Sequence, residues 1–407
     1  MNLILPEIVT RFGTPCFVYD FDQIEARVDA LRRAFAGRLK ISYAMKANPN
    51  GEIVRRMRWA ADFLDISSGG ELDRAVECGW DADLLSFTGP GKRDPELESA
   101  VARRVGAVIL ESVGEARRLD RCAARAGVRQ PVLIRIAPAK IPGGFGVNMA
   151  GKPCQFGIDE EDVDPAIEEI KSLANLELAG FHAFAGTQCL KADVVAGAYE
   201  TYMELFKRCC AMHDVRPDKL VFGSGIGIPY HEGDRPLDLP ALAASVNPAL
   251  DELRADQRFA KTHFLLETGR YLVGEAGVYL TKVVSRKRSR GAEIRICDGG
   301  INHHLGAAGH LGGMIHRNYR MFKLGAEGEP AAQAYDLFGP LCTSIDMLAH
   351  GVQLPALDVG DVIGIHCSGA YGLTASPTRF ISHPVAREIL VQTRGGTAQI
   401  LDASAAG

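Results

Sequence analysis

The sequence lacks the features that mark membrane proteins and nucleic-acid-binding proteins. No uninterrupted apolar run approaches the ~20 residues that a membrane-spanning helix needs. The N-terminal residues reach Pro6 and Glu7 before the apolar core of a signal peptide could form. There is also no excess of positive charge, because 46 Lys and Arg stand against 50 Asp and Glu, a formal net charge of −4. We therefore expect a cytoplasmic protein with neither a membrane nor a nucleic-acid partner.

Cysteine spacings typical of metal sites and disulfide frameworks are missing as well. The ten cysteines form no Cys-x-x-Cys pair, and Cys209 and Cys210 are adjacent. In a chain of this size we expect reduced, mostly buried thiols.

The chain is long enough for two domains, since it has 407 residues, 47% of them hydrophobic, and a single core rarely grows past about 250–300 residues. From about Leu39, short apolar runs alternate with amphipathic helical patterns, and eight such units predict a (β/α)8 barrel. An open doubly wound sheet is the alternative, but it does not need eight units, and no G-x-G-x-x-G turn follows the first run. The runs are LKISYAMK, DFLDISS, LLSFTG, AVILES, VLIRIAP, ELAGFHAFAG, LVFGSGI and HFLLETG.

The segments on either side of the barrel predict a second domain. TPCFVYD is typical of a strand, and the helical pattern FDQIEARVDALRRAFAG follows it, with Asp22 as the expected N-cap and Gly37 as the stop. After Gly277 the strand patterns follow one another without helices, which indicates a β domain that recruits the N-terminal strand. We therefore expect a barrel over residues 28–277 and a β-barrel or sandwich domain over 1–27 and 278–407.

Polar side chains gather at the ends of the predicted barrel strands, where the active sites of such barrels lie. Lys46 is conspicuous, because it follows an apolar run in which an unpaired ammonium would be costly or would have a lowered pKa. A lysine with a lowered pKa is a candidate for attack on a carbonyl carbon. GSGIGIP at the seventh strand end offers backbone N–H groups for a phosphate, although glycines there equally suit a plain turn. The residues at these ends are Lys46, Asp65, Ser67, His182, Phe184, Gly223 to Gly227, Glu267 and Arg270.

Taken together and in order, these motifs resemble the fold type III pyridoxal-phosphate decarboxylases, the family of diaminopimelate, ornithine and arginine decarboxylases. The resemblance covers nearly the whole chain. The motifs that carry it are TPCFVYD, YAMKAN, DISSGGEL, GFHAFAGTQ, GSGIGIP, ETGRYLV, CDGG, GPLCTSID and SGAYG.

The resemblance implies a role for each matching residue. Lys46 would hold pyridoxal 5′-phosphate and return a proton after decarboxylation, and Glu267 would face the pyridine nitrogen. Cys342 would act in the partner subunit's site, which implies a homodimer with shared active sites. The other cofactor-binding residues implied are Asp65, Phe184, Thr187, Gly223, Gly225, Gly227, Gly269, Arg270 and Tyr371, and the substrate-binding residues are Arg270, Thr343, Asp346 and Tyr371.

Two departures from the family pattern narrow the substrate. Phe184 stands where the family has a histidine stacked on the cofactor, and His182 lies two residues earlier on the same side of the strand. Thr343 stands where diaminopimelate and ornithine decarboxylases have an acidic residue that pairs with the distal ammonium of the substrate. A hydroxyl cannot replace that charge, although Asp346, three residues later, is a candidate substitute.

The loop over residues 301–316 is rich in Gly and His. The spacing of its histidines, His303, His304, His310 and His316, is not a ligand pattern, so we expect no metal. This loop, with HAFAGTQ and GPLCT, resembles a narrower branch of the family that includes the glutamyl-carrier-protein decarboxylase of butirosin biosynthesis and exosortase-associated decarboxylases.

We therefore expect a pyridoxal-phosphate-dependent decarboxylase of an α-amino acid without a distal ammonium, either a small molecule or linked to an acyl carrier as in a glutamyl thioester. The alternatives are a diaminopimelate decarboxylase and a racemase or other non-decarboxylating pyridoxal-phosphate protein. Glu267 favours decarboxylation, because alanine-type racemases commonly place an arginine at the pyridine nitrogen.

Overall fold

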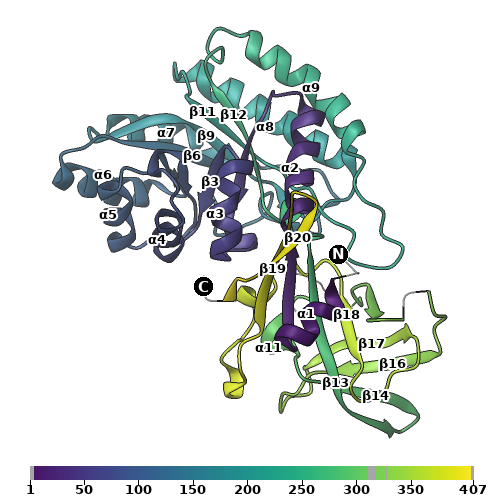
Figure 1. Ribbon diagram of the computed structural model, residues 1–407. Coiled ribbons are helices and arrows are strands. Elements are labelled where there is room, and N and C mark those ends of the chain that lie inside the picture. The colour runs from purple at the N-terminus through teal and green to yellow at the C-terminus, as the bar shows by residue number, and fades with distance from the viewer. Residues whose placement is uncertain (1–3, 310–316, 327, 405–407) are drawn as a thin grey trace.

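The computed structural model describes residues 4–309, 317–326 and 328–404, and Figure 1 shows a barrel of strands and helices beside a mostly β domain. Eight parallel strands pair in the ring order β5, β4, β3, β2, β12, β11, β9 and β6, and β6 closes onto β5. The predicted (β/α)8 barrel is therefore confirmed. Its strands are β2 (Lys40–Ala44), β3 (Phe63–Ile66), β4 (Leu85–Phe87), β5 (Ala107–Leu110), β6 (Gln130–Ala137), β9 (Leu176–Ala183), β11 (Lys219–Gly223) and β12 (His263–Thr268).

Several barrel helices begin where a side chain accepts a hydrogen bond from a free N–H group of the first turn. Ser112 accepts a hydrogen bond from the backbone N–H of Glu115, and Glu115 accepts one from the backbone N–H of Glu111. Ser68 caps the N–H of Glu71 in the same way. These turns fix the residues that directly follow β3 and β5. The helices are α3 (Gly51–Ala60), α4 (Gly69–Glu77), α5 (Asp94–Ala102), α6 (Val113–Ala126), α7 (Val163–Ser172), α8 (Ala192–Met212) and α9 (Leu239–Ala255).

The first long helix, α2 (Phe21–Phe35), begins directly after β1 (Cys16–Asp20). Its N-cap is Asp20, whose side chain accepts from the backbone N–H of Gln23. The sequence-based choice of Asp22 is wrong, because that residue already lies inside the first turn. The expected domain boundary between residues 27 and 28 falls inside this helix. None of the described helices is both long and apolar enough to cross a membrane.

The second domain contains a sheet that joins both ends of the chain (Figure 1). Strand β1 lies between β13 (Gly277–Ser289), to which it is antiparallel, and β19 (Arg387–Arg394), to which it is parallel. The β domain that recruits the N-terminal strand is thus confirmed. Its other strands are β14 (Ala292–Cys297), β15 (Met321–Lys323), β16 (Gln333–Phe338), β17 (Met347–Leu354), β18 (Val362–Ile365) and β20 (Thr397–Asp402). The remaining short elements are helices α1 (Leu5–Phe12), α10 (Arg270–Val273) and α11 (Ile301–His304) and strands β7 (Val147–Asn148), β8 (Ile158–Asp159) and β10 (Gly186–Thr187).

Close backbone contacts hold a segment of the β domain against the barrel. A Cβ atom on Gly369 would lie 1.8 Å from the carbonyl oxygen of Val273, so only glycine fits there. The backbone N–H of Tyr371 donates to the carbonyl oxygen of Ala47 at 2.8 Å, and the side-chain amide of Asn48 donates to the carbonyl oxygen of Gly369 at 2.9 Å. These contacts place Tyr371 next to the end of strand β2.

Two neighbouring valines on β13 allow a test of the hydrophobic core of the β domain. Val283 is 1% exposed, whereas the next residue, Val284, is 47% exposed. We expect Val283→Ala to destabilise the β domain by about 2 kcal/mol, because it removes buried methyl groups and leaves a cavity. Val284→Ala should change stability by less than about 0.5 kcal/mol. Urea unfolding measures the stability of both variants. Equal unfolding midpoints for the two variants would contradict the burial of Val283 in the core.

Candidate active site

The end of strand β2 presents Lys46 to a cavity at the carboxyl end of the barrel. The chain turns sharply in a 3-10 helix, η1 (Met45–Ala47), directly after β2. Lys46 Nζ lies 3.4 Å from Asp65 Oδ2 and 4.0 Å from Glu267 Oε1. Its side chain is 41% exposed and lines the cavity, so it is not buried within the strand as the apolar run suggested.

The charges around Lys46 reverse the expected direction of its pKa. Desolvation lowers the pKa of the ammonium, but the negative charges of Asp65 and Glu267 raise it by more, so the pKa of Lys46 lies above its ordinary value. The expectation of a lowered pKa is therefore wrong for the cofactor-free protein, because the lysine is paired. Burial and the charge of Glu267 raise the pKa of Asp65 to about 7. Asp65 can accordingly exchange a proton near neutral pH.

Asp65 is held from behind by strand β4. Thr88 Oγ1 donates to Asp65 Oδ1, and Ser86 Oγ lies 3.4 Å from the same oxygen. The carboxylate is fully buried and its other oxygen faces Lys46. Its orientation is therefore fixed by neighbouring strands of the barrel.

Glu267, at the end of β12, is paired with His182, which the sequence placed at a strand end without giving it a role. His182 Nε2 lies 3.2 Å from Glu267 Oε2, and both side chains are buried. Burial raises the pKa of Glu267, but the interaction with His182 and the positive charges of Lys46 and Arg135 lower it by more, to about 2. Glu267 is thus an anion over the ordinary pH range.

A second, smaller cavity of about 30 Å³ adjoins the first and shares Lys46, Phe184 and Glu267 with it. It lies beside the turn after β11, where Gly225 has φ +64°, a value that favours glycine. Arg270 Nη1 donates to Tyr230 Oη at 2.6 Å, while its buried Nε has no hydrogen-bond partner among the described residues. Thr187, Gly269 and Tyr371 also line this cavity. Glycine backbone, a hydroxyl and an unsatisfied guanidinium N–H suit an anion such as phosphate.

Two glycines of this turn leave room for aromatic rings. A Cβ atom on Gly223 would lie 1.8 Å from Phe184 Cδ2, and one on Gly225 would lie 2.6 Å from Phe145 Cε1. A Cβ atom on Gly227 would lie 2.8 Å from the carbonyl carbon of Gln188. The predicted glycines are therefore needed for close packing as well as for the turn itself.

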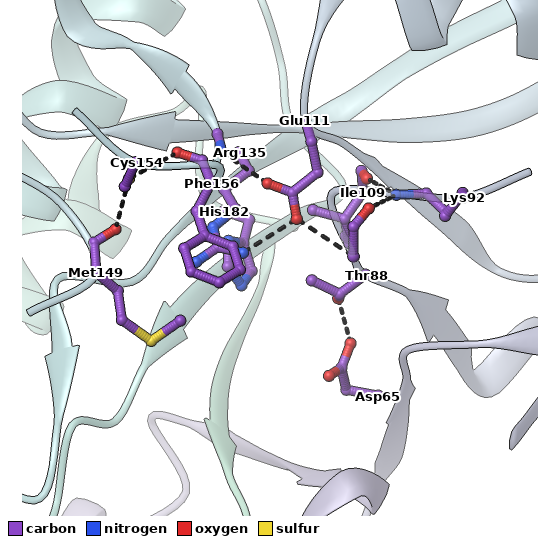
Figure 2. A network of polar contacts seen from close by, with 12 residues as sticks. Asp65, Thr88, Lys92, Ile109, Glu111, Arg135, Met149, Cys154, Phe156 and His182 are labelled. Carbon is purple, nitrogen blue, oxygen red and sulfur yellow. Dashed lines mark hydrogen bonds and ion pairs between the residues drawn. The ribbon is translucent and has the colours of Figure 1, made fainter. Parts of the chain in front are cut away.

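The larger cavity, of about 290 Å³, extends from Lys46 to a wall that sequence reasoning missed. Arg135 on β6 forms part of this wall; its Nη1 lies 3.0 Å from Glu111 Oε1, and its guanidinium lies 4.6 Å from the ring centroid of Phe156 (Figure 2). Met149 and Phe156 belong to the loop after β6. An arginine inside the apolar run VLIRIAP is the same signal as Lys46 and could have identified this wall.

Glu111 has both carboxylate oxygens in use at this wall. Besides Arg135, it accepts hydrogen bonds from the backbone N–H groups of Gly89 at 3.2 Å and Gly157 at 2.6 Å (Figure 2). Behind it, Lys92 Nζ pairs with Glu115 Oε1 at 2.7 Å and donates to two backbone carbonyl oxygens. The network therefore supports the wall and leaves no free carboxylate in it.

The segment between β16 and β17 carries the three remaining predicted residues. Cys342 is exposed and does not line the cavity of its own chain, and Thr343 is partly exposed. Asp346 is 1% exposed, and its two carboxylate oxygens accept from the backbone N–H groups of Ile301 and Leu341, each at 2.7 Å. The carboxylate therefore holds the segment at Leu341 to the start of helix α11, and binding of substrate by Asp346 stays a prediction.

The first two histidines of the Gly- and His-rich loop have protein partners. His303 Nε2 lies 2.8 Å from the carbonyl oxygen of Pro384, and His304 Nε2 lies 2.9 Å from Ser368 Oγ. His310 and His316 lie outside the described residues. Within the described part of the chain, no group of three potential ligands is arranged for a metal ion.

Comparisons with known proteins agree with this geometry. Residues 21–274 match the family model described as pyridoxal-dependent decarboxylase, pyridoxal binding domain. The chain is 35% identical to the L-glutamyl-[BtrI acyl-carrier protein] decarboxylase of Niallia circulans over 98% of this chain and 94% of that one. It is 31% identical to the diaminopimelate decarboxylase of Pseudomonas fluorescens, over 92% and 87%. Among solved structures, the diaminopimelate decarboxylase of Helicobacter pylori complexed with L-lysine has a TM-score of 0.84 at 26% identity, covering 97% of this chain and 95% of that one.

The contact between Gly223 and Phe184 yields a test of the site. Gly223→Ala should displace the Phe184 ring and weaken binding of pyridoxal phosphate to the cofactor-free protein roughly tenfold, because overpacking commonly costs 1–3 kcal/mol. Gly114→Ala is the matched control, since its added Cβ would meet nothing closer than 3.8 Å. Equilibrium dialysis measures both affinities. Unchanged affinity in Gly223→Ala would show that the ring position does not matter for the cofactor.

Proposed function

The chain belongs to the family of fold type III pyridoxal-phosphate-dependent decarboxylases, and from that premise we propose that its substrate is an amino acid without a distal ammonium, such as a glutamyl group joined to a carrier protein through a thioester. The enzyme would remove the α-carboxylate as CO₂ and replace it with a proton. Decarboxylation is the activity of the family, and the class of substrate is what we add to it.

The residues around the two cavities fit the cofactor. Pyridoxal phosphate, when bound, supplies an electron sink for the electron pair left by the departing carboxylate. Lys46 would hold its aldehyde carbon, Glu267 would hold the proton on the ring nitrogen, and Phe184 would lie against the ring. The smaller cavity would take the phosphate, held by the lining residues Thr187, Gly225, Gly269, Arg270 and Tyr371. Gly223 and Gly227 lie on either side of this turn and would allow its close packing.

Lys46 and Asp65 are the residues suited to move the proton that replaces the carboxylate. Lys46 Nζ has three donors and faces the cavity, and Asp65 lies 3.4 Å away. Because the pKa of Asp65 is raised to about 7, this carboxyl can take up or release a proton near neutral pH, whereas Lys46, whose pKa lies above its ordinary value, keeps its proton in the cofactor-free protein.

The commitment of the acidic groups supports a substrate without a distal ammonium. Glu111 is held by Arg135 and two backbone N–H groups, and Asp346 is held by two others. Asp65 and Glu267 face Lys46 and His182. With a neutral Thr343 in the family's acidic position, the described residues offer a diamino substrate no uncommitted carboxylate, and an unpaired ammonium would be costly in such a site. The Niallia circulans relative, whose name gives a glutamyl group on an acyl-carrier protein as substrate, supports the same class.

We also propose that the enzyme is a homodimer in which Cys342 and Thr343 complete the site of the partner subunit. Support comes from their position: Cys342 is exposed and absent from the cavity of its own chain. Phe380 and Val385 are 45% and 57% exposed, as expected of residues that an interface covers.

Subunit complementation tests the shared site. Lys46→Ala and Cys342→Ala homodimers should each have little activity, and mixing them under conditions of subunit exchange should restore activity in hybrid dimers with one intact site. CO₂ release measures the recovery. Mass spectrometry of differently tagged subunits verifies the exchange, and hybrids without any recovered activity would contradict a site made from two chains.

Substrate specificity tests the proposed acyl substrate. We expect free meso-diaminopimelate, ornithine and lysine to be decarboxylated far more slowly than a glutamyl thioester, by about 10⁴-fold in kcat/KM, because an unpaired polar end group in a buried site is strongly rejected. Thr343→Glu should improve turnover of the diamino substrates and impair the thioester, whereas Ser344→Glu, at the neighbouring exposed position, should do neither.

Measurement of CO₂ release from each substrate also tests the alternative function, diaminopimelate decarboxylase. Efficient turnover of meso-diaminopimelate by the unmodified enzyme would reject the acyl substrate and assign the activity named for the Pseudomonas fluorescens relative.

A further inference from the structure

His182 is a buried imidazole with only half of its hydrogen-bonding capacity used. Its side chain is 1% exposed at the end of β9, and Nε2 lies 3.2 Å from Glu267 Oε2. Nδ1 is buried and has no hydrogen-bond partner among the described residues. An unsatisfied buried polar atom costs about 1–3 kcal/mol, so an apolar residue of similar size would be expected if packing were the only requirement.

From its position on β9, the His182 imidazole reaches the carboxylate of Glu267. Along β9, successive side chains point to opposite sides, so His182 and Phe184 lie on the same side at the barrel's carboxyl end. Its neighbours across the two adjacent strands are Arg135 on β6 and Val221 on β11. Figure 2 shows its ring close to Arg135 and behind the Phe156 ring as viewed there. The described residues offer the His182 imidazole one hydrogen-bond partner, Glu267.

We propose that His182 is a positioning residue for Glu267, and through it for the ring nitrogen of the cofactor. An ionised carboxylate only accepts hydrogen bonds, so Nε2 carries the proton of this contact. That N–H occupies Oε2 and leaves Oε1, 4.0 Å from Lys46 Nζ, as the oxygen that remains for the protonated ring nitrogen. The inference rests on the role proposed above for Glu267.

Binding of two forms of the cofactor distinguishes a positioning role of His182 from a role in packing alone. The cofactor-free protein is titrated with pyridoxal phosphate and with its 1-deaza analogue, in which a C–H group replaces the ring nitrogen. His182→Gln can place an amide N–H near the position of Nε2, whereas His182→Asn places its amide near Nδ1. We expect His182→Asn to bind pyridoxal phosphate about tenfold more weakly, the worth of a hydrogen bond to a charged group, with nearly unchanged affinity for the analogue. His182→Gln should stay close to the unmodified protein with both ligands.

The overturning results are equally specific. Equal losses for both ligands in His182→Asn would mean that the histidine only fills space, and unchanged affinity for both would mean that Glu267 needs no support. The variant Glu267→Gln distinguishes a failure of the role proposed for His182 from a failure of the role proposed for Glu267. If Glu267→Gln loses the preference for pyridoxal phosphate over the analogue while His182→Asn keeps it, only the role of His182 fails. If Glu267→Gln keeps that preference, the role of Glu267 itself fails.

Discussion

One lysine between two buried carboxylates is the interaction on which the rest of the site depends. Strand β2 lies between β3 and β12 in the barrel, so Lys46 reaches both Asp65 and Glu267. The carboxylates would repel each other without the cation, and each is held from behind, Asp65 by Thr88 and Glu267 by His182. A change in the charge of any one group therefore alters the proton affinity of the other two.

The sequence allowed the barrel to be predicted because eight apolar runs, each followed by a helical pattern, admit few other arrangements. Positions at the strand ends were equally accessible, since the barrel brings those ends together whatever the intervening loops do. The direction of the pKa of Lys46 was not accessible, because it depends on two carboxylates about 20 and 220 residues away along the chain. The contact of Asp346 with the backbone N–H of Ile301 was not accessible either, because Ile301 belongs to another element, helix α11.

Two acidic residues outside the lining of the larger cavity already accept hydrogen bonds from the protein. Glu111 accepts a hydrogen bond from the backbone N–H of Gly157 and pairs with Arg135. Asp346 accepts hydrogen bonds from two backbone N–H groups. Such residues position loops, and a carboxylate that already accepts hydrogen bonds attracts a cation less than a free one does. The hydrogen bonds that an acidic residue makes are therefore a better guide to its attraction for an amine than its identity alone.

The pairing of β1 with β19 has a consequence for how the chain is made. Residues 16–20 leave the ribosome well before their parallel partner, residues 387–394, is synthesised. The barrel between them can form its own closed sheet while translation continues, whereas β1 keeps an unpaired edge until then, and such edges readily pair with other chains. Strand β1 therefore gains its second neighbour in the sheet only after the whole barrel has been made.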